Sequence, residues 1–156
     1  MEWLAWLENT SLATWVRESE SLWAYPTILT LHTFGLSLLV GANVALALRL
    51  LGFAPGVPLA PLAFLFRIMW AGFVINALSG AGLFIAEATS KATQPIFFVK
   101  LALVALGMAN IYLFPVDLLR EPEKGSLRGK IFAVSSIVIW AGAITAGRLM
   151  AYLKTD

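Results

Sequence analysis

The chain has 156 residues, of which 60% are hydrophobic and only 13% are charged, and its formal net charge is +2. Soluble domains carry about 25% charged residues, so this chain has too few charges to cover a soluble surface. It contains no cysteine, which excludes disulfides, zinc–thiolate sites and iron–sulfur clusters. The sequence contains no run of basic residues of the kind that binds nucleic acids. The composition indicates an integral membrane protein in contact with the lipid bilayer.

Residues 1–20 are too charged to cross a bilayer, and they lack the basic stretch of a cleaved signal peptide. Apolar side chains recur at helical spacing at positions 3, 4 and 7, and again at 12, 15 and 16, with glutamates elsewhere. This pattern predicts one or two short amphipathic helices in the membrane interface. Two roles stay open for this segment, a surface anchor or a lid over a pocket.

Four stretches reach the length of about 20 residues that a helix needs to cross a bilayer. Residues 21–48 and 68–86, which are 28 and 19 residues long, carry no formal charge, and two later stretches contain only Lys100 or Arg148. We predict an all-α integral membrane four-helix bundle, a single domain over 1–156, with spans at about 22–49, 69–88, 95–116 and 130–152. Gly- and Pro-rich residues 52–61 and the hydrophilic residues 117–130 are the expected connections. Residues 62–68 can form a short interfacial helix before the second span.

Basic residues are unevenly distributed between the two ends of these spans. Six follow the first and third spans, and three lie on the other side outside the spans: Arg49, Arg67, Arg120, Lys124, Arg128 and Lys130 against Arg17, Lys91 and Lys154. Basic loops remain on the cytoplasmic side. We therefore expect both termini on the periplasmic side of a bacterial inner membrane.

Ionisable side chains within the spans converge on the predicted outer half, one from each helix. His32 lies early in the first span, Glu87 ends the second, Lys100 lies about 7–8 Å below the start of the third, and Arg148 has a similar depth in the fourth. Polar groups in a bilayer normally face a bundle interior or a cavity. At 100° per residue, three further polar residues share the faces of this cluster: Tyr25 with His32, Asn76 with Glu87, and Tyr152 with Arg148.

Two interpretations of this cluster stay open. In the structural one, Lys100 and Arg148 extend into the lipid headgroups, Glu87 pairs with Lys91, and His32 only hydrogen-bonds a neighbouring helix. In the functional one, the cluster is a pocket of net positive charge for an anionic or redox-active headgroup. The candidate ligand-binding residues are then His32, Lys100, Arg148, Glu87, Tyr25, Tyr152 and Asn76, with His32 as the titratable or metal-ligating group and Glu87 as the counter-charge of the two cations.

Small residues four positions apart recur in the fourth span, as Gly142/Ala146 and Ala143/Gly147. Such spacing lets helices approach closely, and it serves an internal bundle, a homodimer or a larger membrane complex equally well. No motif for hydrolysis or phosphoryl transfer is present, so no catalytic residue is assigned.

Several motifs carry a resemblance to a known family. Leu31-His-Thr-Phe-Gly35, Leu48-Arg-Leu-Leu-Gly52, Phe97-Phe-Val-Lys100 and the segment from Trp140 to Tyr152 together resemble a family of bacterial four-helix inner-membrane proteins that is a domain of unknown function. The resemblance covers most of the chain and implies the fold and the location, but no activity. Ala47 stands where that family often has an acidic residue.

More distantly, a histidine early in the first span is similar to cytochrome b561-type and copper-resistance membrane proteins. That resemblance implies a b-type haem as one candidate cofactor, whereas a bis-histidine site needs two histidines and this chain has one. Methionine can be the second axial ligand. Met150 has a suitable depth, but it lies about 160° around the helix from Arg148, so we expect that only one of the two faces His32.

Three functions are consistent with these observations. The favoured one is a ligand-binding membrane protein, as a subunit of an electron-transfer assembly. The second is a transporter or channel component for protons or small anions, and the third is a scaffold without a ligand.

Overall fold

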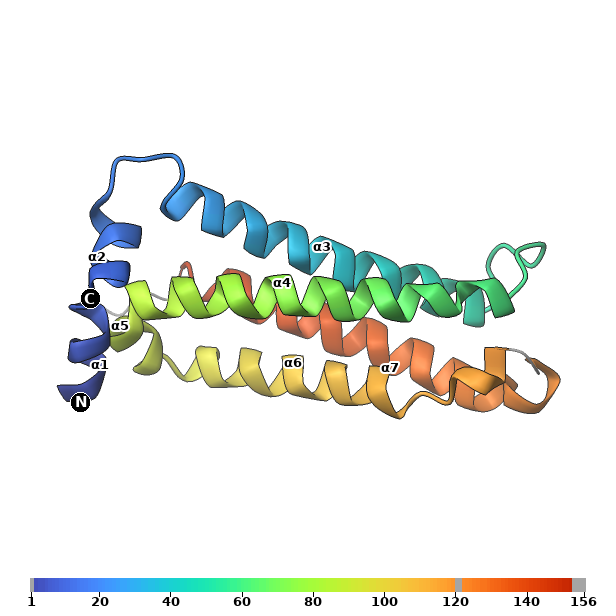
Figure 1. Ribbon diagram of the computed structural model, residues 1–156. Helices are drawn as coiled ribbons and strands as arrows, with labels where there is room; N and C mark the ends of the chain where they lie inside the picture. The colour runs from blue at the N-terminus through green and yellow to red at the C-terminus, as the bar shows by residue number, and fades with distance from the viewer. Residues whose placement is uncertain (1, 120–121, 153–156) are drawn as a thin grey trace.

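The computed structural model describes residues 2–119 and 122–152, and these residues form helices and connections without a strand (Figure 1). In chain order the elements are α1 (Glu2–Glu8), α2 (Ser11–Glu18), α3 (Tyr25–Leu50), the 3₁₀ helix η1 (Ala60–Phe64), α4 (Leu65–Ala86), α5 (Ala88–Ala92), α6 (Pro95–Leu113), the 3₁₀ helix η2 (Val116–Leu119) and α7 (Pro122–Leu149).

Helices α3, α4, α6 and α7 run side by side as a four-helix bundle (Figure 1). Each contains an apolar window long enough to cross a membrane, with mean hydropathy between 1.6 and 2.0. Only 17% to 39% of the residues in these windows are buried inside the molecule, so most of the apolar surface faces outward. A helix satisfies its own backbone hydrogen bonds, as a segment in lipid must. The protein is a small multi-pass membrane protein, and the predicted fold class is confirmed.

Several predicted boundaries differ from the observed helix ends by three residues or more, and three of these differences have a clear local reason. Helix α6 ends at Leu113 rather than at 116, because Pro115 holds Phe114 in an extended conformation. Helix α7 begins at Pro122, well before 130, since proline suits the first turn of a helix. Helix α4 begins at Leu65, directly after η1. Residues 62–68 are therefore divided between the end of η1 and the start of α4, and they do not form a separate interfacial helix.

Helix α3 ends where the sequence predicts, at Leu50. Gly52 follows with φ of 103°, a left-handed conformation that glycine adopts without steric cost and that commonly terminates helices. Pro26 lies in the first turn of the same helix, where its missing N–H leaves no hydrogen bond unmade.

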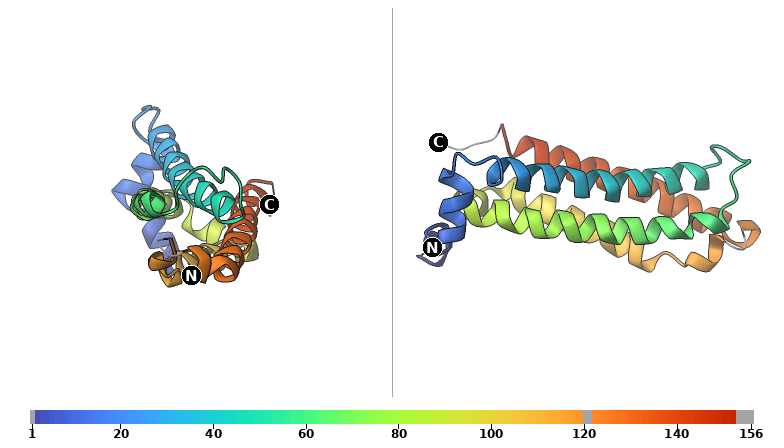
Figure 2. Two further views of the ribbon diagram at one scale, coloured as in Figure 1. Left: turned by 90° about the vertical axis from the view of Figure 1, so that its right-hand side faces the viewer. Right: turned by 45° about the horizontal axis from the view of Figure 1, so that its top comes forward.

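Helices α1, α2 and α5 lie across one end of the bundle, which we call the cap end (Figures 1 and 2). Here α3 and α6 begin and α4 and α7 end; the opposite end, with η1 and η2, is the loop end. The Glu8 carboxylate accepts hydrogen bonds from the Thr89 backbone N–H at 2.8 Å and from its hydroxyl at 3.0 Å. Arg17 donates to the Ala86 carbonyl at 3.4 Å. Side chains from both ends of the N-terminal segment thus hold it against α4 and α5.

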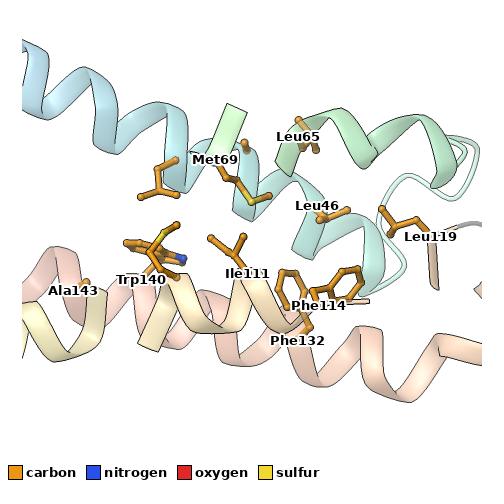
Figure 3. Packing of buried hydrophobic residues seen from close by; sticks show 12 residues of the cluster. Leu46, Leu65, Met69, Ile111, Phe114, Leu119, Phe132, Trp140 and Ala143 are labelled. Carbon is orange, nitrogen blue, oxygen red and sulfur yellow. The ribbon is translucent and has the colours of Figure 1, made fainter. Parts of the chain in front are cut away.

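The hydrophobic core lies in the middle of the bundle and toward the loop end (Figure 3). Phe114 stacks on Phe66 with ring centroids 5.7 Å apart and contacts Phe132 at 4.3 Å. Trp140 is only 1% exposed and covers Gly107, where an added Cβ would lie 2.8 Å from the indole ring. In lipid the hydrophobic effect does not drive helices together, so close packing of this kind is what holds the four helices together.

The α3–α4 pair makes a close backbone approach in mid-bundle. A Cβ added at Gly72 would lie 2.6 Å from the backbone nitrogen of Leu39 and 2.7 Å from the carbonyl oxygen of Gly35. Only glycine permits two helices to pack at this separation. The contact sets the rotation of α3 against α4, and therefore which α3 side chains face α4 at the cap end.

Candidate ligand-binding site

His32 is held against α4 by a pair of reciprocal hydrogen bonds. Its ring Nδ1 lies 3.0 Å from the main-chain oxygen of Asn76, and the Asn76 amide donates to the main-chain oxygen of His32 at 2.8 Å. The Ser79 hydroxyl lies 3.2 Å from the same Nδ1. Gly80 gives the ring room, because an added Cβ there would lie 3.0 Å from Cε1. The imidazole is therefore fixed in position and orientation by one turn of α4.

Lys100 approaches the same region from α6. Its side chain extends along α7, where a Cβ added at Gly147 would lie 3.6 to 3.8 Å from Cε, Cδ and Nζ. Among the described residues, Lys100 forms no salt bridge and no hydrogen bond through its side chain. This half-buried ammonium therefore has hydrogen-bond donors that no described protein group satisfies.

Two neighbouring cavities meet at His32, Lys100 and Gly147. The first, which we call the Glu87 cavity, has a volume of about 250 Å³, and the second, the Arg148 cavity, has a volume of about 270 Å³. Of the predicted site residues, Tyr25 and Glu87 line the first cavity with His32 and Lys100, while Asn76 and Arg148 line the second with the same two residues. Six of the seven predicted residues therefore line one or both cavities.

Tyr152 lies outside both cavities. It is 68% exposed, and its hydroxyl accepts a hydrogen bond of 3.0 Å from Arg148. The guanidinium carbon lies 5.1 Å from the Tyr152 ring centroid. This surface pair corresponds to the structural interpretation of Arg148, although the same side chain also borders the Arg148 cavity.

Glu87 pairs with Lys91 and forms no direct salt bridge with Lys100 or Arg148, as in the structural interpretation. Its carboxylate pairs with Lys91 at 3.1 Å, one turn away along the chain. Four-residue spacing brings two side chains together on one face of a helical turn, whereas Lys100 and Arg148 project from other helices. Glu87 still lines the first cavity, so it adds negative charge there without neutralising Lys100 directly.

Met150 and Arg148 lie on different faces of α7, and each lines a different one of the two cavities. Met150, 7% exposed, lines the Glu87 cavity, and Arg148 lines the Arg148 cavity. Since His32 borders both cavities, the expectation that only one of the two residues faces the ring stays a prediction.

The donor set and the volume do not fit a b-type haem within one copy of the chain. Cavities of about 250 and 270 Å³ are smaller than the roughly 300–1,000 Å³ typical of sites for drug-sized ligands, and a porphyrin needs more space. The described residues also contain no group of three or more His, Cys, Asp or Glu side chains arranged to hold a metal ion. His32 is thus not part of a multidentate metal site there.

Sequence reasoning missed the aromatic wall of the Glu87 cavity. Phe84 of α4 and Phe97 of α6 both line it, and their rings stack at 5.2 Å with an interplanar angle of 10°. A signal was present, because Phe97 precedes Lys100 by three residues and Phe84 follows Gly80 by four, which places each pair on one helix face. Trp23, which precedes α3, is 77% exposed and lines neither cavity.

The N-terminal helices do not line either cavity, whose linings begin at Tyr25. The side chains of Trp3, Trp6 and Trp15 are between 46% and 69% exposed. This arrangement favours the surface-anchor interpretation of residues 1–20 over the lid.

A second polar cluster lies deeper in the bundle. Asn43 is 0% exposed and donates to the Ser136 hydroxyl at 3.4 Å, and Asn110 donates to the same hydroxyl at 2.8 Å. Asn110 also lines a loop-end cavity of about 280 Å³ together with Arg128. Polar side chains therefore occur at successive depths between the cap-end and loop-end cavities.

Comparison of the chain with protein-family models, with curated proteins and with solved structures finds no match. The fold and the cavities define a four-helix multi-pass membrane protein with a histidine–lysine pair between its helices.

Proposed function

We propose that this membrane protein binds a small anionic or redox-active ligand at the cap end, between His32 and Lys100. The observation that carries the proposal is the half-buried Lys100 ammonium, which lines both cavities beside His32 and has no acidic partner among the described residues. A cation held in this position without an anion is costly in a bilayer, and a bound anionic or strongly polar oxygen would offset that cost.

The chemical roles follow from the side chains present. Lys100 donates hydrogen bonds to a ligand oxygen, His32 contacts a second polar atom, and the Phe84–Phe97 wall packs against the apolar part. A ligand held in this way suits a subunit of a membrane electron-transfer assembly, as one copy or as a homodimer. We further propose a bacterial inner membrane as the location, on the charge asymmetry of the loops and on the resemblance to the bacterial four-helix family.

Native mass spectrometry of the detergent-purified full chain tests the proposal. We expect a small-molecule adduct on the wild type that is lost in Lys100→Met, a variant that keeps the aliphatic packing on Gly147. Lys130→Met, at an exposed position near the loop end, is the matched control and should keep the adduct. Equal adducts in all three proteins, or none in any of them, would contradict the proposal. A visible absorption spectrum of the same preparation shows whether the adduct is a chromophore.

A second candidate function is the conduction of protons or small anions. The deeper cluster of Asn43, Ser136 and Asn110 favours it, since it continues the polar groups toward Arg128 at the loop end. Flux into liposomes that falls in both Lys100→Met and Ser136→Ala would support conduction, whereas an adduct without flux would favour binding alone.

A further inference from the structure

The hydrogen bonds of the His32 ring determine which of its two nitrogens is protonated. The protonation pattern in turn restricts the class of ligand that the ring can bind. Nδ1 lies 3.0 Å from the main-chain oxygen of Asn76, and a carbonyl oxygen can only accept. Nδ1 is therefore the protonated nitrogen. The Ser79 hydroxyl directs its own proton to the Ile75 carbonyl at 2.6 Å, so at 3.2 Å it can also accept from Nδ1.

In the neutral ring, the second nitrogen, Nε2, then carries a lone pair. Cε1 and Nδ1 are the ring atoms nearest Gly80 of α4, and His32 lines both cavities. No hydrogen bond to Nε2 occurs within residues 2–119 and 122–152. A ligand group that satisfies this nitrogen must donate a hydrogen bond.

Lys100 imposes the opposite requirement at a second point, because an ammonium has three donors and no acceptor. It also repels a metal cation at Nε2. A fully ionised anion would satisfy Lys100 but offers Nε2 no proton, whereas a molecule with a hydroxyl at one position and an accepting oxygen at another satisfies both groups.

The Glu87 cavity restricts the size and shape of this molecule. Its volume of about 250 Å³ exceeds the roughly 150 Å³ that accommodates benzene in an engineered cavity and suits one substituted six-membered ring. The stacked Phe84 and Phe97 rings form part of the wall, against which an aromatic ring packs favourably.

We infer that the site takes a single-ring phenol or quinol, whose hydroxyl donates to His32 Nε2 and whose second oxygen accepts from Lys100. This inference rests on the proposed binding function and narrows its ligand class. The shared chemistry is the ring hydroxyl, which either a membrane-dissolved quinol or a water-borne phenolic acid can supply.

Equilibrium dialysis of the detergent-purified full chain under anaerobic conditions tests the inference. The probes are tetramethylhydroquinone and tetramethylbenzoquinone, which share a carbon skeleton but differ in their hydroxyl donors. We expect the hydroquinone to bind about five- to tenfold more tightly, the effect of one hydrogen bond. 4-Hydroxybenzoate and benzoate form the second pair. If the protein prefers the hydroxylated member in this pair alone, the ligand is a water-borne phenolic acid and not a membrane-dissolved quinol.

Two substitutions of His32 distinguish the role of Nε2 in ligand binding from the role of Nδ1 in the hydrogen bond to α4. Asparagine can reach the position of Nδ1 and keep the hydrogen bond to Asn76, but it has no atom at Nε2; glutamine reaches the position of Nε2. We expect His32→Asn to keep the wild-type melting temperature and lose the preference for the hydroxyl, and His32→Gln to retain part of that preference.

The two proposals fail in distinguishable ways. Equal binding of both members of each pair, or a preference that survives in His32→Asn, overturns the hydroxyl inference, and an adduct that Lys100→Met abolishes would still support the binding function. No binding of any probe, together with no adduct sensitive to Lys100→Met, overturns both.

Discussion

At the scale of single residues, the candidate site consists of side chains that the protein holds in place but whose hydrogen-bonding capacity it does not use completely. His32 uses Nδ1 to bind α4 and lines both cavities, and no hydrogen bond to its Nε2 occurs among the described residues. Lys100 packs its methylenes on Gly147 and presents the ammonium. A purely structural histidine or a lysine extending into the headgroups has no need of a shared cavity, and so the combination favours binding over packing.

Glu87 supplies a prediction at this scale. Its side chain is 37% exposed and pairs with Lys91 at 3.1 Å, and exposed ion pairs contribute only about 0–1 kcal/mol. We therefore expect Glu87→Gln to lower the free energy of unfolding by less than about 1 kcal/mol, measured by SDS titration in mixed micelles. Glu2→Gln, in the exposed first turn of α1, is the control. A loss of several kcal/mol would instead show that Glu87 neutralises a buried cation.

At the scale of elements, the α3–α4 contact positions the histidine. Gly72 and Gly35 let the two backbones approach in mid-bundle, and one to two turns further toward the cap end Asn76 and Gly80 receive His32. The site geometry therefore depends on glycines that do not line it.

A matched pair of glycine substitutions tests this dependence. In Gly72→Ala, the new Cβ would lie 2.6 Å from a backbone nitrogen that cannot move alone, so we expect a loss of about 1–3 kcal/mol and weaker ligand binding. In Gly41→Ala, on the exposed side of α3, nothing lies within 4 Å, and we expect no loss and a gain of up to about 1 kcal/mol. Unfolding in SDS mixed micelles measures both, and similar losses in the two variants would contradict this account.

At the scale of the whole molecule, the two ends of the bundle differ. The middle of the bundle is filled by aromatic and apolar packing from Trp140 to Phe114 (Figure 3), while the cap end contains the two cavities that His32 lines and is crossed by α1, α2 and α5. Exposed tryptophans of α1 and α2 suit the headgroup region of a membrane. The packed middle of the bundle lies between the cap-end cavities and the loop-end cavity, so the proposed ligand would reach its site from the cap side or between the helices.

The orientation of this asymmetric molecule is a prediction from loop charges. A reporter fused after Asp156 should behave as periplasmic, and one inserted at Gly125 as cytoplasmic, because six basic residues against three favour the loop end inside. Alkaline phosphatase and fluorescent-protein activity measure the two locations. The reverse pattern would make the ligand site face the cytoplasm.

The sequence by itself determined the membrane class, the four spans and the depth of the polar residues. These properties follow from local composition, since the length of an uncharged run and the rise per residue need no knowledge of neighbouring helices. The depths predicted from the sequence correctly placed four residues at one end of the bundle: His32, Lys100, Glu87 and Arg148. The start of α7 at Pro122 and the end of α6 before Pro115 were also encoded locally, but the polarity of the loop and the apolar run obscured them.

Only the tertiary structure decided which of these residues contact one another. The rotation of each helix about its axis depends on packing with its neighbours, such as the Gly35–Gly72 approach, and no single helix contains that information. For this reason the sequence could not choose between Lys91 and Lys100 as the partner of Glu87, and it could not show that Tyr152 lies outside both cavities. The Asn76 carbonyl that fixes the His32 proton is a main-chain atom, so residue types could not reveal it. A hydrogen bond between helices is set by their relative position, which exists only in the folded bundle.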